Sequence, residues 1–265
     1  MKIIPMMNLK GGVGKTSTTV NAAATLALDY RQRVLVVDGD SQCNTTEFFC
    51  AHSGHMKNTF ADMLRGTAAG DAIRPSKIEG IDLLPADDSL MDLDLSKVEG
   101  QLVDVTCLKK LRGSLAERYD WVLIDCPPAF NAAAAAALLA ADAVVIPIKL
   151  DAFSLRGMSN LQRQIHNMKR LNPELKIAGF LPTMAYKSDT IDEAERMLRG
   201  SGLHVFPSIR RSGPVDAMTF SQVPLILSSP KSAACQDYRR FVEELAGPSP
   251  RKRRARTEGG EQHGV

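Results

Sequence analysis

The chain has 265 residues, of which 44% are hydrophobic and 5% aromatic, and its formal net charge is +3. This length and composition suffice for one large α/β domain, and the absence of any window of 18 or more apolar residues argues against a membrane-spanning protein. All of the excess charge lies in residues 247–265, which carry five Lys/Arg and two Glu, because residues 1–246 contain 28 basic and 28 acidic side chains.

Apolar runs alternate with helical patterns along the chain. This alternation predicts an α/β fold with a doubly wound, mostly parallel sheet flanked by helices, and binding residues at the carboxyl ends of the strands. Pro5 is unexpected inside a central strand, because it removes a ladder donor. The predicted strands lie near residues 2–7, 33–38, 81–84, 121–125, 143–148, 176–182 and 203–206, and the predicted helices at 16–29, 59–65, 102–118, 131–140, 154–171, 189–199 and 233–246.

Both ends of the chain differ from the apolar middle. The start runs directly into a glycine-rich segment and leaves no room for a secretory signal, and five cysteines without a C-x-x-C pair indicate reduced thiols. We therefore expect a cytosolic protein. From Gly247 onward Gly, Pro, Ser and charges replace the apolar periodicity, so residues 1–246 are expected to fold and residues 247–265 to form a disordered basic tail.

The first functional motif is KGGVGKT at residues 10–16, between a predicted strand and a predicted helix. Its glycines let backbone N–H groups approach phosphate oxygens, and the helix adds its positive dipole end. Lys15 is expected to reach the β- and γ-phosphates, with the Thr16 hydroxyl on Mg²⁺. Leu9 replaces the usual first glycine, and Lys10 adds a second lysine. Because lysine, glycines, strand and helix coincide, we favour a phosphate loop over a plain glycine-rich turn.

Two carboxylates follow the second predicted strand, in VLVVDGDSQCN at residues 34–44. Asp38 and Asp40 have the i, i+2 spacing that points both to one side of an extended segment. One is expected to support the Mg²⁺ shell, and the other to position a water. A lone D-x-D is more often a solvated turn, but its place after the second strand of a phosphate-loop domain favours the functional interpretation.

A third motif, WVLIDCPP at residues 121–128, is an apolar strand that ends in Asp125. This arrangement is typical of a Walker B carboxylate that holds Mg²⁺ through water. Cys126 follows where many motor ATPases carry a glutamate base. Activation of the attacking water must therefore come from elsewhere, and Asp40 is the best candidate.

Together these motifs and LPTM at residues 181–184 resemble the ParA/Soj branch of the ParA/MinD family of partition ATPases, over roughly residues 1–246. The resemblance implies a deviant Walker A ATPase domain over residues 1–246 that uses ATP and Mg²⁺. It implies a homodimer formed on ATP binding, in which Lys10 reaches the partner subunit's nucleotide and Asp40 positions the attacking water, with Lys10, Lys15 and Asp40 as the catalytic set. The implied nucleotide-binding residues are Lys10, Gly11, Gly12, Val13, Gly14, Lys15, Thr16, Ser17, Asp38, Asp125, Thr183 and Met184, and the implied Mg²⁺ residues are Thr16, Asp38 and Asp125.

The resemblance also implies non-specific DNA binding, a ParB-like centromere-binding partner and a nucleoid-associated location. The segment at residues 208–225 follows the family's arginine-bearing run only loosely, so its arginines are at least as well explained as solvated charges. The same alternative holds for the basic run at residues 250–256. The candidate DNA residues are Arg210, Arg211, Arg251, Lys252, Arg253 and Arg254.

The resulting prediction is a slow ATP-dependent switch that partitions or positions a plasmid, a chromosome region or a mobile element. A MinD-like membrane ATPase is the closest alternative, but it would end in an amphipathic helix, and after Ala246 the only aliphatic residues are Ala255 and Val265. A metabolic P-loop enzyme would need its own catalytic pocket. An iron–sulfur reductase would need suitably placed cysteines. A tyrosine autokinase would end in a tyrosine cluster, whereas the last tyrosine is Tyr238.

Overall fold

The computed structural model describes residues 1–50, 56–66, 72–93 and 103–249. Seven strands form one sheet in the order β3-β4-β2-β5-β1-β6-β7. All neighbouring strands are parallel except β3 and β4, so the expected doubly wound, mostly parallel sheet is confirmed. The strands are β1 (Lys2–Met6), β2 (Val34–Asp38), β3 (Arg74–Pro75), β4 (Ile81–Leu84), β5 (Trp121–Asp125), β6 (Ala143–Lys149) and β7 (Lys176–Thr183).

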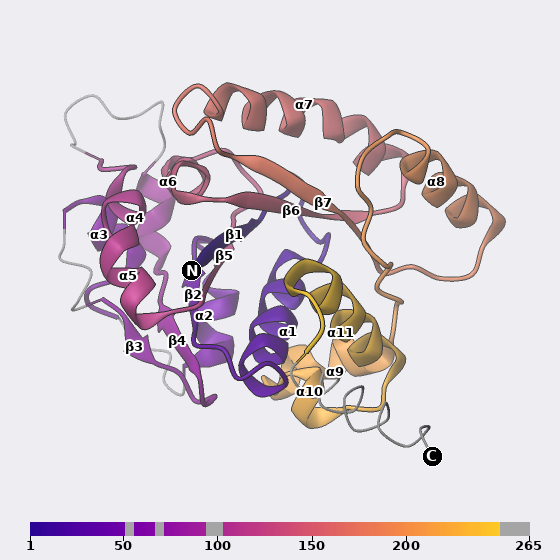
Figure 1. Ribbon diagram of the computed structural model, residues 1–265, viewed down its shortest axis with the longest axis horizontal. Coiled ribbons are helices and arrows are strands. Elements are labelled where there is room, and N and C mark those ends of the chain that lie inside the picture. The colour runs from indigo at the N-terminus through magenta and orange to yellow at the C-terminus, as the bar shows by residue number, and fades with distance from the viewer. Residues whose placement is uncertain (51–55, 67–71, 94–102, 250–265) are drawn as a thin grey trace, which may run out of the picture.

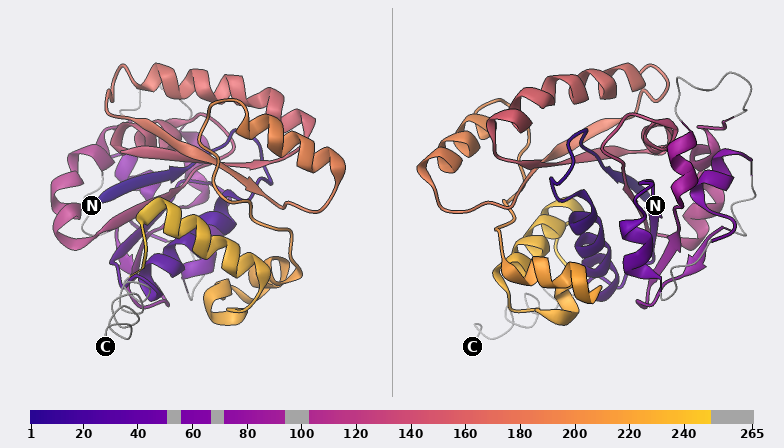
Figure 2. Two further views of the ribbon diagram at one scale, coloured as in Figure 1. Left: turned by 45° about the vertical axis from the view of Figure 1, so that its right-hand side comes forward. Right: turned by 180° about the vertical axis from the view of Figure 1, so that it is seen from behind.

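Helices cover both faces of the sheet, and α7 lies on the side opposite α1 and α11 (Figures 1 and 2). Among the described residues, no helix combines the length and the apolarity needed to cross a bilayer. The helices are α1 (Lys15–Leu28), α2 (Asn44–Phe49), α3 (Phe60–Leu64), α4 (Cys107–Lys110), α5 (Arg112–Arg118), α6 (Ala132–Ala140), α7 (Ala152–Met168), α8 (Asp189–Arg199), α9 (Gly213–Ser221), α10 (Leu225–Ser228) and α11 (Ala233–Ala246), with a 3₁₀ turn η2 (Asp88–Asp92).

Two hydrophobic cores lie on the two faces of the sheet. In β5 the side chains of Val122 and Ile124 belong to the core that α3, α6 and α7 complete, whereas Trp121 and Leu123 belong to the core under α1, α2 and α11. This division follows from the two-residue period of a strand. Every residue of the alanine-rich α6 is buried, so the run of small side chains packs closely against its neighbours, as expected from its composition.

Pro5 lies in the central strand β1, and the structure explains why it is tolerated there. The N–H groups of Ile3 and Met7 face β6, where they donate to Asp142 Oδ2 at 2.8 Å and to Val145 O at 3.0 Å. Pro5 shares their side of the strand, and β1 and β6 are paired only at Met6. The missing donor therefore falls on the side of β1 that faces β6, and the register between β1 and β5 stays unbroken from Lys2 to Met6.

The predicted strand at residues 203–206 is wrong. Only Val205 forms a bridge, to Phe180 of β7, with Phe206 N–H donating to Phe180 O at 2.8 Å. The next rung would need an N–H from Pro182, which has none, and the chain shifts so that Ile209 N–H donates to Pro182 O instead. The ladder stops after one residue for this reason.

Helix boundaries differ at several other positions. The predicted helix at 102–118, described from residue 103, is two helices that meet at Leu111, which ends α4 and precedes α5. The sequence prediction missed α2, α9, α10, η2 and the two-residue β3, all of which are short. The predicted disordered tail, apart from residues 247–249, lies outside the described residues.

Candidate nucleotide site

The phosphate loop lies between the end of β1 and the start of α1. Gly12 has φ of 69° and Gly14 has φ of 81°, a left-handed conformation that residues with a side chain rarely adopt. Gly14 precedes the first residue of α1, Lys15, so the backbone N–H groups of the first helical turn face the loop. The loop therefore has the open N–H groups and the helix dipole that favour an anion.

Lys15 is buried within this loop, and its Nζ donates to the backbone oxygen of Lys10 at 3.2 Å. Burial lowers the pKa of Lys15, while the carboxylate of Asp125 acts in the opposite direction. A buried ammonium whose main protein partner is a backbone oxygen gains strongly from a polyphosphate.

Asp125 ends β5 and faces the first residues of α1. Its Oδ2 accepts hydrogen bonds from Thr16 Oγ1 at 2.6 Å and from Thr45 Oγ1 at 2.7 Å. Its Oδ1 is buried and has no hydrogen-bond partner among the described residues. Burial is the main cause that raises the pKa of Asp125. An unpartnered carboxylate oxygen beside a threonine hydroxyl fits the oxygen ligands that Mg²⁺ prefers, so these two residues suit the metal.

Asp38 lies beside Asp125 in the sheet, as its partner in register. It is fully buried, and its Oδ2 accepts from Thr46 N–H and Thr46 Oγ1, both at 2.7 Å, while Oδ1 accepts from Asp40 N–H at 3.1 Å. Burial, followed by the charge of Asp125, raises the pKa of Asp38. Both oxygens of Asp38 therefore hold the loop that follows β2, so any contact with Mg²⁺ would be additional to that task.

Gly39, which separates Asp38 from Asp40, lies too close to the backbone of β5 to carry a side chain. Its N–H donates to Asp125 O at 2.8 Å, and a Cβ at this position would lie 2.9 Å from the same oxygen. Asp40 follows with a half-buried side chain whose Oδ1 accepts from Gln42 N–H at 3.0 Å. The charge of Asp40 acts on both Lys15 and Asp125, so it belongs to the same electrostatic site.

Lys10 has a different environment from Lys15. Its side chain is 37% exposed, and its Nζ donates to both carboxylate oxygens of Asp151, at 2.8 and 2.9 Å. Its N–H donates to Asn8 Oδ1 at 3.0 Å, and Asn8 Nδ2 donates to Pro147 O at 2.8 Å. The loop end that carries Lys10 is therefore tied to β6.

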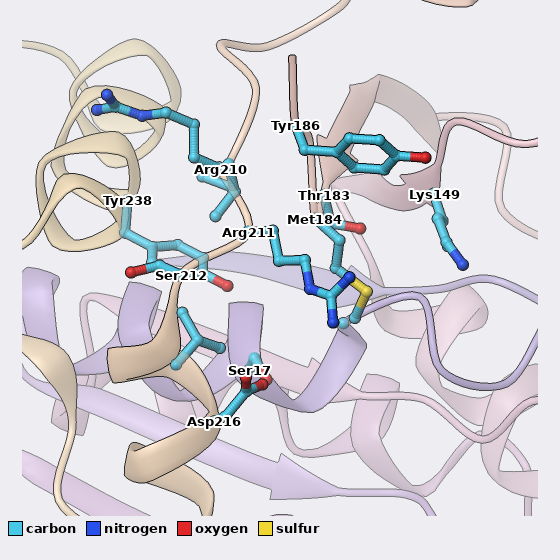
Figure 3. A pocket seen from close by; sticks show the side chains of 13 residues that line it. Ser17, Lys149, Thr183, Met184, Tyr186, Arg210, Arg211, Ser212, Asp216 and Tyr238 are labelled. Carbon is cyan, nitrogen blue, oxygen red and sulfur yellow. The ribbon is translucent and has the colours of Figure 1, made fainter. Parts of the chain in front are cut away.

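A pocket of about 360 Å³ adjoins the phosphate loop on the side of Gly14 and Ser17. Thr183, at the end of β7, closes one wall and donates through Oγ1 to Val13 O at 2.9 Å. Figure 3 shows Arg211 and Met184 among the side chains that line this pocket. Its other lining residues include Lys149, Tyr186, Ile209, Val215 and Tyr238.

Arg210 points away from this pocket, toward α11 (Figure 3). Its guanidinium donates twice to the carboxylate of Asp237, with both distances 2.8 Å, and Arg240 pairs with the same carboxylate. Asp237 has no exposed surface, so Arg210 is part of a structural ion-pair cluster. Of the candidate DNA residues, Arg211 is exposed at the pocket, and Arg251, Lys252, Arg253 and Arg254 lie outside the described residues.

The structure thus brings most of the predicted residues to one edge of the sheet, at the ends of β1, β2, β5 and β7. Sequence reasoning missed Asn8, Thr45, Thr46 and Asp151. The two threonines directly follow the second motif, which was a usable signal because hydroxyls beside a metal carboxylate are common partners. Asp151 belongs to no motif and gave no signal.

Comparison with known proteins agrees with this geometry. A family model described as an AAA domain matches residues 1–177. The chromosome partitioning protein ParA of Caulobacter vibrioides (strain NA1000 / CB15N) is 33% identical over 257 residues, which cover 92% of this chain and 94% of ParA. The residues matched by the family model include the phosphate loop and both carboxylate strands.

Two solved structures with bound nucleotide share the fold. A McdA variant from Cyanothece in complex with ATP is 23% identical, with a TM-score of 0.81 over 93% of this chain and 96% of that chain. Cobyrinic acid a,c-diamide synthase from Mycobacterium smegmatis, with bound ADP and magnesium, is 26% identical, with a TM-score of 0.78 over 94% of this chain and 97% of that chain. ATP, in the first structure, and magnesium, in the second, are the two ligands expected from the sequence.

Proposed function

Because the chain belongs to the ParA/Soj/MinD family of P-loop ATPases, we propose that it is an ATP-dependent dimeric switch that binds DNA non-specifically and partitions or positions a plasmid, a chromosome region or a mobile element. A ParB-like centromere-binding protein is the proposed partner. The proposed location is cytoplasmic and nucleoid-associated.

The observation that carries the proposal is the contrast between the two lysines of one loop. Lys15 is buried and faces the interior of its own site, whereas the side chain of Lys10 is 37% exposed at the rim. A lysine at the rim is accessible to a second subunit's nucleotide, and a buried one is not. A cation supplied from the partner would offset the charge of two triphosphates that face each other.

Each part of the site has a proposed task. The loop N–H groups and Lys15 bind the phosphates, and the pocket beside Gly14 takes the base and ribose, with Thr183 and Met184 at its wall. Thr16 and Asp125 hold Mg²⁺, which neutralises phosphate charge when bound. Asp38 orders the loop after β2 through its bonds to Thr46 and Asp40.

Asp40 is the proposed residue that positions the attacking water. Cys126 follows Asp125 where a glutamate base stands in other ATPases, and its thiol is buried, with a pKa raised by that burial. A neutral buried thiol does not accept a proton from water. Asp40 is a half-buried carboxylate whose charge acts on Asp125 and Lys15, which supports its proposed task at this site.

The test is the ATPase rate of the full chain alone, with duplex DNA, and with anionic liposomes. Lys15→Ala serves as the control, because it removes the phosphate lysine and should abolish turnover under all three conditions. Stimulation by DNA is the expected result. Stimulation by liposomes instead would favour a MinD-like membrane ATPase, and a rate that responds to neither would favour a metabolic P-loop enzyme.

A further inference from the structure

Asp151 contacts the lysine that distinguishes this phosphate loop, although it belongs to none of the sequence motifs. It lies two residues after the end of β6, and both of its carboxylate oxygens accept hydrogen bonds from Lys10 Nζ. The two residues are 141 positions apart in the chain. In the structure, Lys10 is therefore held by a carboxylate of its own subunit.

This ion pair is partly exposed to solvent. The side chain of Asp151 is 28% exposed, and that of Lys10 is 37% exposed. Ion pairs this close to solvent contribute little to stability, because water replaces much of the interaction when they separate. A polyphosphate carries several negative charges. It therefore attracts an ammonium group more strongly than one hydrated carboxylate does.

A second lysine, Lys149, also lies near the Asp151 carboxylate. Lys149 Nζ lies 4.0 Å from Asp151 Oδ2, and the side chain of Lys149 is 48% exposed. When Lys10 leaves, Asp151 thus keeps a cation beside it and does not become an isolated charge. The presence of Lys149 therefore lowers the free-energy cost of separating Lys10 from Asp151.

We propose that Asp151 is a positioning residue that holds Lys10 within its own subunit, and that Lys10 leaves it to reach the partner's nucleotide. This inference rests on the proposed function, because it requires a dimer in which Lys10 acts across the interface. Asp151 then sets how readily the ATP-bound chain dimerises. Two such pairs open for each dimer, so the effect of each pair on the dimerisation constant is multiplied.

The test is the dimer dissociation constant of Asp151→Asn, measured by sedimentation velocity with Mg²⁺ and a non-hydrolysable ATP analogue. Asparagine keeps the shape and one acceptor oxygen but removes the charge. If each exposed pair changes the constant by about 1.4- to 5-fold, the two together should tighten the dimer by about 2- to 25-fold. Asp151→Glu, which keeps the charge, should stay close to the wild type.

The matched control is Asp104→Asn. It weakens an ion pair of similar geometry, in which Lys110 Nζ lies 2.7 Å from Asp104 Oδ2 and the aspartate side chain is 33% exposed. This pair joins the loop before α4 to the last residue of α4, away from the phosphate loop, so the control should dimerise like the wild type. Affinity of Asp151→Asn for the analogue, measured at protein concentrations below dimerisation, should also be unchanged, which a general loss of structure would not allow.

The possible results separate this inference from the proposed function. A wild-type chain that dimerises and an Asp151→Asn variant that dimerises no more tightly, or more weakly, would overturn the role of Asp151 alone. Weaker dimers would mean that Asp151 orients Lys10 inside the dimer. Absence of nucleotide-dependent dimers in both chains would overturn the proposed switch and the role of Asp151 together.

Discussion

At the scale of single residues, the two lysines of the phosphate loop differ in burial and in partner. Lys15 is buried, with a pKa lowered by that burial, and it bonds to a backbone oxygen. Lys10 is partly exposed and bonds to a carboxylate. The first therefore gains most from the nucleotide of its own chain, and the second is placed to make a contact elsewhere.

This difference predicts the behaviour of Lys10→Ala. The variant should bind ATP nearly as well as the wild type, because Lys15 and the loop N–H groups remain. It should lose dimerisation that depends on the nucleotide, which sedimentation with a non-hydrolysable analogue measures. A variant that dimerises normally would remove the proposed role of Lys10 across the interface.

Asp40→Ala tests the assignment of the attacking water. Among the described residues, the Asp40 carboxylate accepts a hydrogen bond from Gln42 N–H, two residues further along the chain, so its loss should not disturb the loop that Asp38 holds. Nucleotide binding and dimerisation should therefore survive, while turnover falls about 100-fold, as for other groups that assist proton transfer. Single-turnover phosphate release with excess protein gives the rate, and an undiminished rate would assign the water to another group.

At the scale of elements, the extended segment after α8 is fixed to α11 by one buried carboxylate. Asp237 of α11 accepts bonds from the N–H and the guanidinium of Arg210 and pairs with Arg240. Burial alone would raise the pKa of Asp237, but the hydrogen bonds from Arg210 outweigh it and hold that pKa below the ordinary value. Arg211 lies in the wall of the pocket, and the position of this wall thus depends on the contact between the neighbouring Arg210 and Asp237.

Asp237→Ala should lower the free energy of unfolding by about 2 kcal/mol, because it removes several charge-assisted hydrogen bonds while the two half-exposed arginines can be hydrated. Urea denaturation at neutral pH measures the loss, with Asp104→Ala as a surface control that should cost less than about 1 kcal/mol. Since the folded pKa of Asp237 is depressed, its contribution is present above the ordinary aspartate pKa and is lost as the pH falls through the folded value. The difference in the free energy of unfolding between the variant and the wild type should therefore decrease at acidic pH. A difference that stays unchanged would contradict the ion-pair explanation.

The same scale shows what the sequence could and could not predict. The strands that end in Met6, Asp38, Asp125 and Thr183 were recognisable as short apolar runs, so the edge of the sheet that carries the site was predictable. The predicted strand at residues 203–206 does not form, because the neighbouring strand β7 carries Pro182, which cannot donate the next hydrogen bond. Which residue of β7 faces this segment depends on the register of the two segments, and the local sequence pattern does not reveal it. Asp151 was missed for a similar reason, because its contact with Lys10 joins positions 141 residues apart.

At the scale of the whole molecule, charge is divided unevenly between the ATPase domain and the end of the chain. Residues 1–246 carry equal numbers of basic and acidic side chains, and Arg210, one of the two DNA candidates in the described part of the chain, is occupied by Asp237. The basic run PRKRRAR at residues 250–256 holds five cations. The ten cations of a dimer would be brought together only in the ATP state, which would couple nucleotide to DNA retention.

Removal of residues 248–265 should therefore flatten the dependence of DNA affinity on salt. Each phosphate contact contributes about 0.9 to the slope of log K against log salt, so the loss of up to five contacts per chain lowers that slope by up to about 4.5. Removal of residues 257–265 alone is the matched control, because it deletes the two glutamates of the tail and keeps all five cations. Its slope should equal or slightly exceed that of the full chain. Salt titrations of duplex binding with an ATP analogue measure all three proteins, and superimposable curves would place the DNA surface on the folded domain, where Arg211 is the remaining exposed candidate among the described residues.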